Sequence, residues 1–165
     1  MNGQAILARL RERLGARMLE THDYRGDHTG VVAREGIVDA LACCRDDAEL
    51  RFDLLMDLTA VDYLTFPGRE DGPRFEVVYH LYSTEHNHRV RLKVRVEEDD
   101  AWTPTATPLW PIANWLEREV WDMFGIRFEG HPDLRRLLLY EEFVGHPLRK
   151  DYPINRRQPL IGPKV

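Results

Sequence analysis

Acidic and histidine side chains that could do proton or metal chemistry gather in the last third of this 165-residue chain. A carboxylate beside a histidine can act as an acid/base pair, and several such groups can hold a zinc or iron ion. The candidates are Glu117, Glu119, Asp122, His131 and His146. The arginines between them compete for the same carboxylates, so the pattern favours a network of ion pairs over a catalytic centre. A free-standing His/carboxylate metalloenzyme is the alternative from a different class of function.

Sequence motifs for other kinds of catalysis are missing. The chain has no Gly-x-Gly-x-x-Gly or Walker loop for a nucleotide and no Gly-x-Ser-x-Gly elbow for a nucleophilic serine. His86 and His88 stand two apart, as a metal pair on one strand would, but a turn is the favoured interpretation because no third ligand can be identified. A second group of possible ligands is favoured as a solvated polar loop. It consists of His22, Asp23, Asp27 and His28.

The two cysteines, Cys43 and Cys44, are adjacent. Neighbouring cysteines rarely form an unstrained disulfide, and two thiolates cannot replace the usual four of an iron–sulfur cluster. The sequence therefore predicts that this chain carries no cluster and that both cysteines pack as small apolar residues on a helix.

A helix over residues 111–124 is predicted to position the candidate residues. Pro111 suits the first turn of a helix, and Gly125 suits a left-handed stop. At 100° per residue, one wide face of this helix is apolar. That face comprises Ile112, Ala113, Trp115, Leu116, Val120, Met123 and Phe124.

Two residues break the pattern of this helix. Glu119 falls inside the apolar face, where a buried carboxylate must find a cation or several hydrogen-bond donors. Arg135 or Arg136 is its predicted partner, and losing one member of a buried Glu119–Arg135 pair would cost roughly 3–5 kcal/mol. Trp121 falls on the polar side with Glu117, a position typical of either an incidental aromatic residue or a protein contact surface.

Three stretches, in this order along the chain, resemble one known family. They are Asp57 to Tyr63; then Glu117-Arg118-Glu119 with Asp122-Met123-Phe124, His131 and Arg135; and finally Gly145 to Pro153. Together they are similar to the family of the C subunit of respiratory complex I, also called its thirty-kilodalton subunit. The resemblance covers most of the chain from about residue 52 to residue 153.

The resemblance implies a non-catalytic subunit in the peripheral arm of the proton-translocating NADH:quinone oxidoreductase. In that family the chain itself binds no cofactor, while the complex uses NADH, FMN, iron–sulfur clusters and quinone. The implied partners are chiefly the D subunit, which lines the quinone cavity, and also the B and I subunits. The implied location is the cytoplasmic side of the cell inner membrane, with membrane contact only through partners. A membrane-bound hydrogenase or another donor:quinone complex has an equivalent subunit and is the nearer alternative.

The resemblance also implies roles for individual residues. One set would join the helix to the loop that follows it, namely Glu117, Arg118, Glu119, Asp122, His131, Arg135 and Arg136. A second set would present the tail to the D subunit, namely His146, Arg149, Lys150, Asp151 and Tyr152.

The rest of the sequence predicts an α+β fold, a small mixed or antiparallel sheet with helices packed on it. Apolar spacing predicts helices over residues 4–14 and 37–44. Strands are predicted at 17–21, 30–33, 58–63, 74–82 and 90–96, the last two as an antiparallel hairpin. Residues 50–56 fit either helix or strand, and residues 97–108 are interpreted as a linker. One face of the last strand is a basic row, Arg91, Lys93 and Arg95, which is either solvated or docks a partner.

The predicted division is an α+β domain over residues 1–130 and an extended, irregular, partner-binding tail over residues 131–165. Five prolines interrupt the tail, yet its large apolar residues, Leu160 among them, are too many for a purely solvated segment. Its seven basic residues, Lys164 included, outnumber four acidic ones, while the whole chain carries −5, so we expect an acidic protein partner rather than nucleic acid. No apolar run approaches the roughly 18 residues of a membrane span. The N-terminus lacks the apolar core of a signal peptide, so we expect a cytoplasmic chain.

Overall fold

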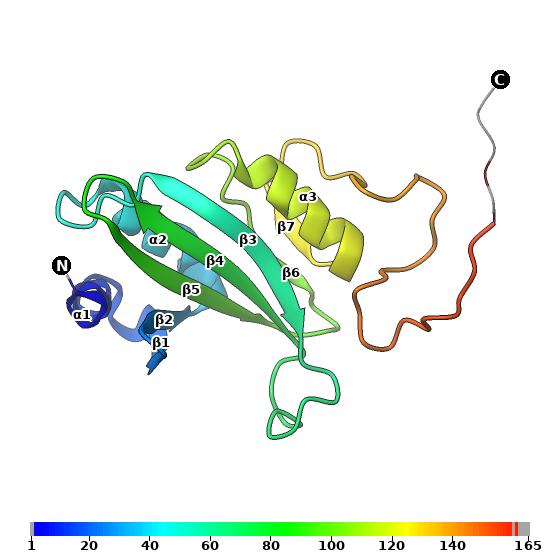
Figure 1. The fold of residues 1–165 in the computed structure, drawn as a ribbon, viewed down its shortest axis with the longest axis horizontal. Helices are drawn as coiled ribbons and strands as arrows, with labels where there is room; N and C mark the ends of the chain where they lie inside the picture. Colours follow the sequence, from blue (N-terminus) through cyan, green and yellow to red (C-terminus); the bar gives the residue numbers. More distant parts are fainter. Residues whose placement is uncertain (1, 160, 162–165) are drawn as a thin grey trace.

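A computed structural model describes residues 2–159 and residue 161. Its main sheet has five strands in the order β1-β2-β5-β4-β3, with helices packed around it (Figure 1). The strands are β1 (Met18–Tyr24), β2 (Asp27–Val32), β3 (Leu54–Asp62), β4 (Phe75–Ser83) and β5 (His88–Val96). The helices are α1 (Gly3–Leu14), α2 (Ile37–Asp46) and α3 (Ala113–Phe124), with short 3-10 turns η1 (Gly15–Arg17) and η2 (Arg34–Gly36). A small second sheet pairs β6 (Trp102–Pro104) with β7 (Arg127–Glu129). The predicted α+β class is confirmed.

The centre of the main sheet is the predicted antiparallel hairpin of β4 and β5. Val90, Leu92 and Val94 alternate along β5 and are all buried in the core, as the two-residue period of a strand requires. β3 continues the sheet antiparallel to β4, and β2 pairs with β5 in parallel. The sheet is therefore mixed, with β1 and β3 at its two edges.

The helices α1 and α2 form where the apolar spacing predicts them. Ile6 and Leu10 of α1 are fully buried, and Figure 1 shows α2 lying behind β4 and β5. The side chain of Asn2 accepts a hydrogen bond from the Ala5 N–H and so satisfies one of the free donors at the start of α1. Cys43 and Cys44 are free thiols on α2.

The N-terminal hairpin is longer than predicted. β1 and β2 are joined by only Arg25 and Gly26, both at positive φ, which is the geometry of a tight two-residue hairpin turn. His22 and Asp23 therefore lie on β1, and Asp27 and His28 lie on β2. The interpretation of these four residues as a loop is wrong. Within residues 2–159 and 161, no group of three or more His, Cys, Asp or Glu side chains could hold a metal ion.

Two ambiguous stretches are resolved by the structure. Residues 50–56 enter β3 at Leu54, and residues 97–108 contain β6, a three-residue strand that is too short for a pattern to reveal. His86 lies in the turn before β5, and its Nε2 bonds the carbonyl oxygen of Ala48, while Nε2 of His88 bonds that of Leu50. Both rings therefore contact backbone oxygens of the segment before β3.

The basic row on β5 is neutralised within the sheet. Glu76 of β4 accepts hydrogen bonds from Lys93 and from Arg69, while Arg91 and Arg95 pair with Asp27 and Glu20. Burial alone would raise the pKa of Glu76, but the Lys93 ammonium and the Arg69 guanidinium hold that pKa at about 2. The row is thus part of a network of ion pairs rather than a free cationic surface.

The chain after β7 has no regular structure in the described part. Figure 1 shows this segment, orange to red, running beside α3 and then away from the sheet. Leu160 and Lys164, which belong to the predicted tail, lie outside the described residues. None of the helices in residues 2–159 has the length and apolar character needed to cross a membrane.

Candidate functional site: helix α3 and the tail it holds

Helix α3 brings most of the candidate residues together, but not in the predicted orientation. Gly125 ends the helix in the left-handed conformation, as predicted. Glu117 and Asp122 are fully buried and Arg118 nearly so, whereas Glu119 is exposed. The prediction that Glu119 is the buried carboxylate is therefore wrong, and the buried acidic residues of α3 are Glu117 and Asp122.

Asp122 organises the loop that follows the helix. Its Oδ2 accepts three consecutive peptide N–H groups, those of Leu137, Leu138 and Leu139, at 3.0, 2.9 and 3.0 Å. Its Oδ1 accepts a 2.6 Å hydrogen bond from the guanidinium of Arg136. Burial alone would raise the pKa of Asp122, but these N–H groups and the Arg136 charge hold it below its ordinary value. Asp122 is thus an ionised anchor for the backbone of residues 137–139.

Two arginines bind the same loop through its carbonyl groups. Arg118 donates to the carbonyl oxygens of Arg135 and Arg136, each at 3.1 Å, and Arg136 donates to those of Phe143 and Gly145. A guanidinium presents a rigid array of donors, so it can span two carbonyl groups at once. Together with Asp122, these side chains define the path of the chain from residue 135 to residue 145.

The predicted pairing of Glu119 with Arg135 or Arg136 does not occur. Arg136 pairs with Asp122, and Arg135 forms an exposed ion pair with Asp133 at 2.9 Å. The predicted energetic cost of losing a buried Glu119–Arg135 pair therefore does not apply, because the two side chains do not pair. Asp122–Arg136 is the buried pair of this site.

Glu117 is a buried carboxyl group, and its hydrogen bonds within the described residues come from neutral donors. Its oxygens accept the hydroxyl of Thr105 at 2.5 Å and the N–H of Ala106 at 2.6 Å. Burial raises its pKa to about 7, and these two hydrogen bonds offset only part of that rise. Glu117 therefore joins α3 to the segment after β6, and burial moves its pKa toward neutral pH.

The two candidate histidines contact the backbone of α3. Nε2 of His131 bonds the carbonyl oxygen of Asn114 at 3.1 Å, and Nδ1 of His146 bonds that of Asp122 at 3.0 Å. Burial, together with the nearby guanidinium groups of Arg149 and Arg136, lowers the pKa of His146. Each histidine thus links the segment after α3 to the backbone of the helix through one hydrogen bond.

The C-terminal candidates also lie against the body of the protein. Arg149 donates a 2.6 Å hydrogen bond to the carbonyl oxygen of Phe124, at the end of α3. The Lys150 N–H and the Asp151 carboxylate reach the end of the sheet, and the ring of Tyr152 stacks on Phe143 with centroids 6.1 Å apart. The structure therefore brings both sets of candidate residues into one continuous arrangement, apart from the exposed side chains of Glu119 and Arg135.

Sequence reasoning missed three residues that complete this arrangement: Asp62, Arg74 and Thr105. Asp62 and Arg74 bind the tail, and Thr105 binds Glu117. A weak signal existed for the first two, because each is a charged residue at the end of an apolar strand and charges at such sites need partners. Nothing in the sequence links Thr105 to a residue twelve positions away.

Replacing Gly125 with alanine tests how closely the tail approaches the end of α3. Gly125 has φ +78°, and a Cβ there would lie 2.6 Å from Nε2 of His146 and 2.9 Å from Nη2 of Arg149. We expect a loss of roughly 1–2 kcal/mol from the left-handed backbone alone, with a further loss from crowding, measured by urea unfolding. Gly68→Ala is the matched control, because Gly68 has φ +81° but nothing within 4 Å of its Cβ position. Equal losses in both variants would show that the tail does not press on Gly125.

Comparison with sequence families and curated proteins gives a consistent assignment. Residues 31–158 match the model of the family described as "Respiratory-chain NADH dehydrogenase, 30 Kd subunit". A protein of Citrifermentans bemidjiense is 47% identical over 163 residues, covering 98% of this chain and 96% of its own length. One of Roseiflexus castenholzii is 49% identical over 158 residues, covering 96% and 88%. Both relatives are named as the C subunit of NADH-quinone oxidoreductase.

Two solved structures share the fold. One, titled Nqo5 of the trypsin-resistant fragment (1-134), is 37% identical with a TM-score of 0.70, over 81% of this chain and all of that one. The other comes from the membrane-bound sulfane sulfur reductase, titled an archaeal respiratory membrane complex; it is 28% identical with a TM-score of 0.74, over 93% of this chain and 86% of that one. With the family match spanning most of the chain, these likenesses show that the protein belongs to the family of the 30 Kd subunit of respiratory-chain NADH dehydrogenase, which is the C subunit of NADH-quinone oxidoreductase.

Proposed function

We propose that the chain is a non-catalytic subunit in the peripheral arm of NADH:quinone oxidoreductase. In this role it packs on the D subunit near the quinone site, close to the B and I subunits, and supports electron transfer from NADH to quinone in a proton-translocating complex. The tail, residues 131–165, is the partner-binding segment, and residues 1–130 form its support. Contact with the membrane is through partners, on the cytoplasmic side of the cell inner membrane.

The observation that carries this proposal is a tail whose backbone is fixed while several of its large apolar side chains are exposed. Asp122, Arg118 and Arg136 hold the backbone, yet large apolar residues of the same segment are exposed. They are Leu138, Tyr140, Val144, Leu148 and Ile154. A folded surface that gathers exposed apolar groups is typical of a protein–protein interface.

The buried charges of α3 and the tail support a structural rather than a catalytic role. Asp122, Arg118 and Arg136 are each bonded to backbone groups or to another charge of the same network. We therefore propose that this chain binds no cofactor itself and that the complex supplies FMN, iron–sulfur clusters, NADH and quinone.

Affinity capture of the tagged full-length chain from its native membranes tests this function. We expect mass spectrometry to identify the flavin and iron–sulfur subunits together with the D subunit, and the eluate to reduce quinone with NADH. Ile154→Asp should lower the recovery of the D subunit, because it places a charge in the apolar surface of the tail. Leu19→Asp is the matched control, since Leu19 is an exposed leucine on β1, away from the tail. Recovery of the chain alone, loaded with zinc or iron, would contradict the proposal and favour the metalloenzyme.

A second candidate is the equivalent subunit of another membrane-bound respiratory complex. The likeness to the chain from the sulfane sulfur reductase complex favours it, because that likeness covers 93% of this chain. The same capture experiment separates the two candidates. A large subunit that keeps two Cys-x-x-Cys nickel-ligand pairs would indicate a hydrogenase, and an eluate without NADH oxidation would indicate a different electron donor.

A further inference from the structure

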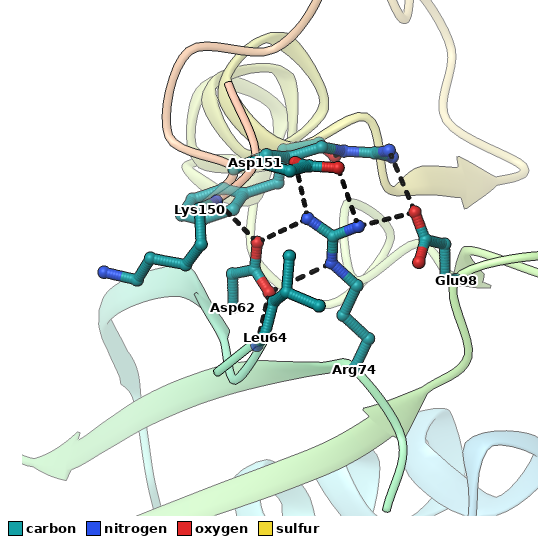
Figure 2. Close-up of polar contacts among 8 residues, drawn as sticks. Asp62, Leu64, Arg74, Glu98, Lys150 and Asp151 are labelled. Carbon is teal, nitrogen blue, oxygen red and sulfur yellow. Dashed lines mark hydrogen bonds and ion pairs between the residues drawn. The ribbon is translucent and has the colours of Figure 1, made fainter. Parts of the chain in front are cut away.

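Arg74, directly before β4, has every hydrogen-bond donor of its buried guanidinium occupied (Figure 2). Nε donates to Oδ1 of Asp62 at 3.0 Å, and Nη2 donates to Oδ2 of Asp62 at 2.8 Å and to Oδ1 of Asp151 at 2.7 Å. Nη1 donates to Oδ2 of Asp151 at 3.2 Å and to Oε1 of Glu98 at 2.5 Å. A guanidinium has five N–H groups, so three carboxylates satisfy it completely.

Asp62, at the end of β3, is equally saturated. Its Oδ1 accepts the N–H of Leu64 at 2.9 Å as well as Arg74, and its Oδ2 accepts the N–H of Lys150 at 2.8 Å as well as Arg74. Burial alone would raise the pKa of Asp62, but these donors hold it below its ordinary value. Asp62 and Arg74 therefore bind the peptide N–H of one tail residue and the carboxylate of the next, which fixes both the position and the direction of the tail.

The neighbouring contacts of the tail reinforce this attachment. The guanidinium groups of Arg74 and Arg149 lie 4.9 and 5.2 Å from the ring centroid of buried Phe75. The Leu148 N–H bonds the carbonyl oxygen of Met123 in α3. By contrast, the side chain of Lys150 points away from the cluster in Figure 2. Only the backbone of Lys150 takes part in the attachment.

We propose that Asp62, Arg74 and Asp151 form a clip that holds the tail on the body of the isolated chain before any partner binds. The clip is asymmetric. Arg74 and Asp62 are buried and stay bonded to each other, and Glu98 remains beside them, whereas the Asp151 side chain is half exposed. The tail can therefore detach without leaving an unpaired buried charge, which is the arrangement that a releasable attachment requires.

The clip has a consequence for partner binding, which rests on the function proposed above. A segment that is already held in one conformation loses less conformational entropy when it binds than a free segment does. The clip thus fixes the path of the tail near residue 151, and the exposed apolar side chain of Ile154 projects three residues beyond it.

The experiment is amide hydrogen exchange and limited trypsin digestion of the isolated full-length chain. In the wild type we expect slow exchange of the Lys150 N–H and slow cleavage after Lys150, compared with cleavage after exposed Arg157. Asp151→Asn removes the charge on the tail side and leaves the buried Arg74–Asp62 pair intact. We expect it to accelerate exchange of the Lys150 N–H by about tenfold or more, the factor that corresponds to ~1.4 kcal/mol, while the core amides of β4 and β5 keep their exchange rates. Cleavage after Lys150 is compared between the wild type and Arg74→Gln, because both keep the same residues around the cut bond.

Asp133→Asn is the matched control, because Asp133 is also a tail aspartate, but its pair with Arg135 is exposed. The clip is refuted if the Lys150 N–H of Asp151→Asn exchanges as slowly as it does in this control, or if the wild-type Lys150 N–H exchanges as fast as an unbonded amide. Arg74→Gln provides a second measurement, and it should release the tail to at least the same extent. If Asp151→Asn releases the tail but the D subunit is not captured, the clip is supported and the proposed partner is contradicted. If the D subunit is captured but Asp151→Asn does not release the tail, only the clip is contradicted.

Discussion

Asp122→Asn is expected to lower the free energy of unfolding by about 3–5 kcal/mol, because it removes the charge that pairs with the largely covered Arg136 guanidinium and leaves peptide N–H groups of the tail without their acceptor. Asparagine keeps one acceptor oxygen, whereas the carboxylate accepts three peptide N–H groups through Oδ2 and the guanidinium through Oδ1. The new amide group would place its own N–H groups against one of these donors. Urea unfolding of the purified chain, followed by its intrinsic tryptophan fluorescence, measures the loss.

The effect of Asp122 also has a defined pH dependence. Because its pKa is lowered in the folded chain, its stabilisation is present above the ordinary carboxyl value and is lost as the pH falls through the folded pKa. Asp133→Asn, an exposed tail aspartate, should change stability by less than about 1 kcal/mol. If both variants unfolded at the same urea concentration, Asp122 would not be the anchor of the tail.

Glu117→Gln is expected to stabilise the chain at pH 8 and to leave it nearly unchanged at pH 5. The folded pKa of Glu117, about 7, lies above the ordinary 4.5, so the folded chain binds the extra proton. Its stabilising effect is complete below the unfolded pKa and is lost as the pH rises through the folded pKa. Between pH 5 and pH 8 this amounts to about 2–3 kcal/mol. Glutamine resembles the protonated acid at every pH, since it can accept from Ala106 and donate to Thr105.

Thermal and urea unfolding of the two proteins at pH 5 and pH 8 measure this difference. Glu119→Gln is the matched control, because Glu119 is an exposed glutamate two residues along the same helix. It should give the wild-type pH dependence. A pH dependence of Glu117→Gln that is parallel to the wild type would mean that Glu117 is ionised throughout and that its burial is compensated by other donors.

Elements whose stability comes from one apolar face could be predicted from the sequence. The helix α1 follows from the spacing of Ile6 and Leu10, and the β4–β5 hairpin follows from the alternation of Val90, Leu92 and Val94. In α1 and β5 the buried apolar residues lie on one face of the element, so apolar residues recur along the sequence with the period of a helix or a strand.

The orientation of α3 could not be predicted because the helix is covered on more than one side. Val120 and Phe124 are buried in the apolar core, while backbone groups of the tail bind Arg118 and Asp122, and a hydrophobic pattern does not reveal such backbone groups. The prediction assumed one apolar face, and on that assumption Glu119 would be buried in the core. In the structure, Ile112 and Trp115 of that face are the exposed side chains.

The attachments of the tail depend on residues far away along the chain. Asp151 reaches Arg74 across 77 residues, and Lys150 reaches Asp62 across 88. The resemblance to a known family identified Lys150 and Asp151 as candidate residues, and it implied contact with a partner subunit. It did not predict their contacts with Asp62 and Arg74 at the end of the sheet. Contacts over such separations follow from the complete fold, which no local pattern specifies.

The parallel pairing of β2 with β5 sets the order in which the sheet can be completed during synthesis. Thr29 pairs with Arg91, 62 residues later, so at ordinary translation rates its partner strand emerges about 3–12 s after it. In that interval β2 is paired with β1 alone, and its other edge is open to pairing with other chains. We therefore expect the nascent N-terminal hairpin to be open to edge-to-edge association until β5 has been made.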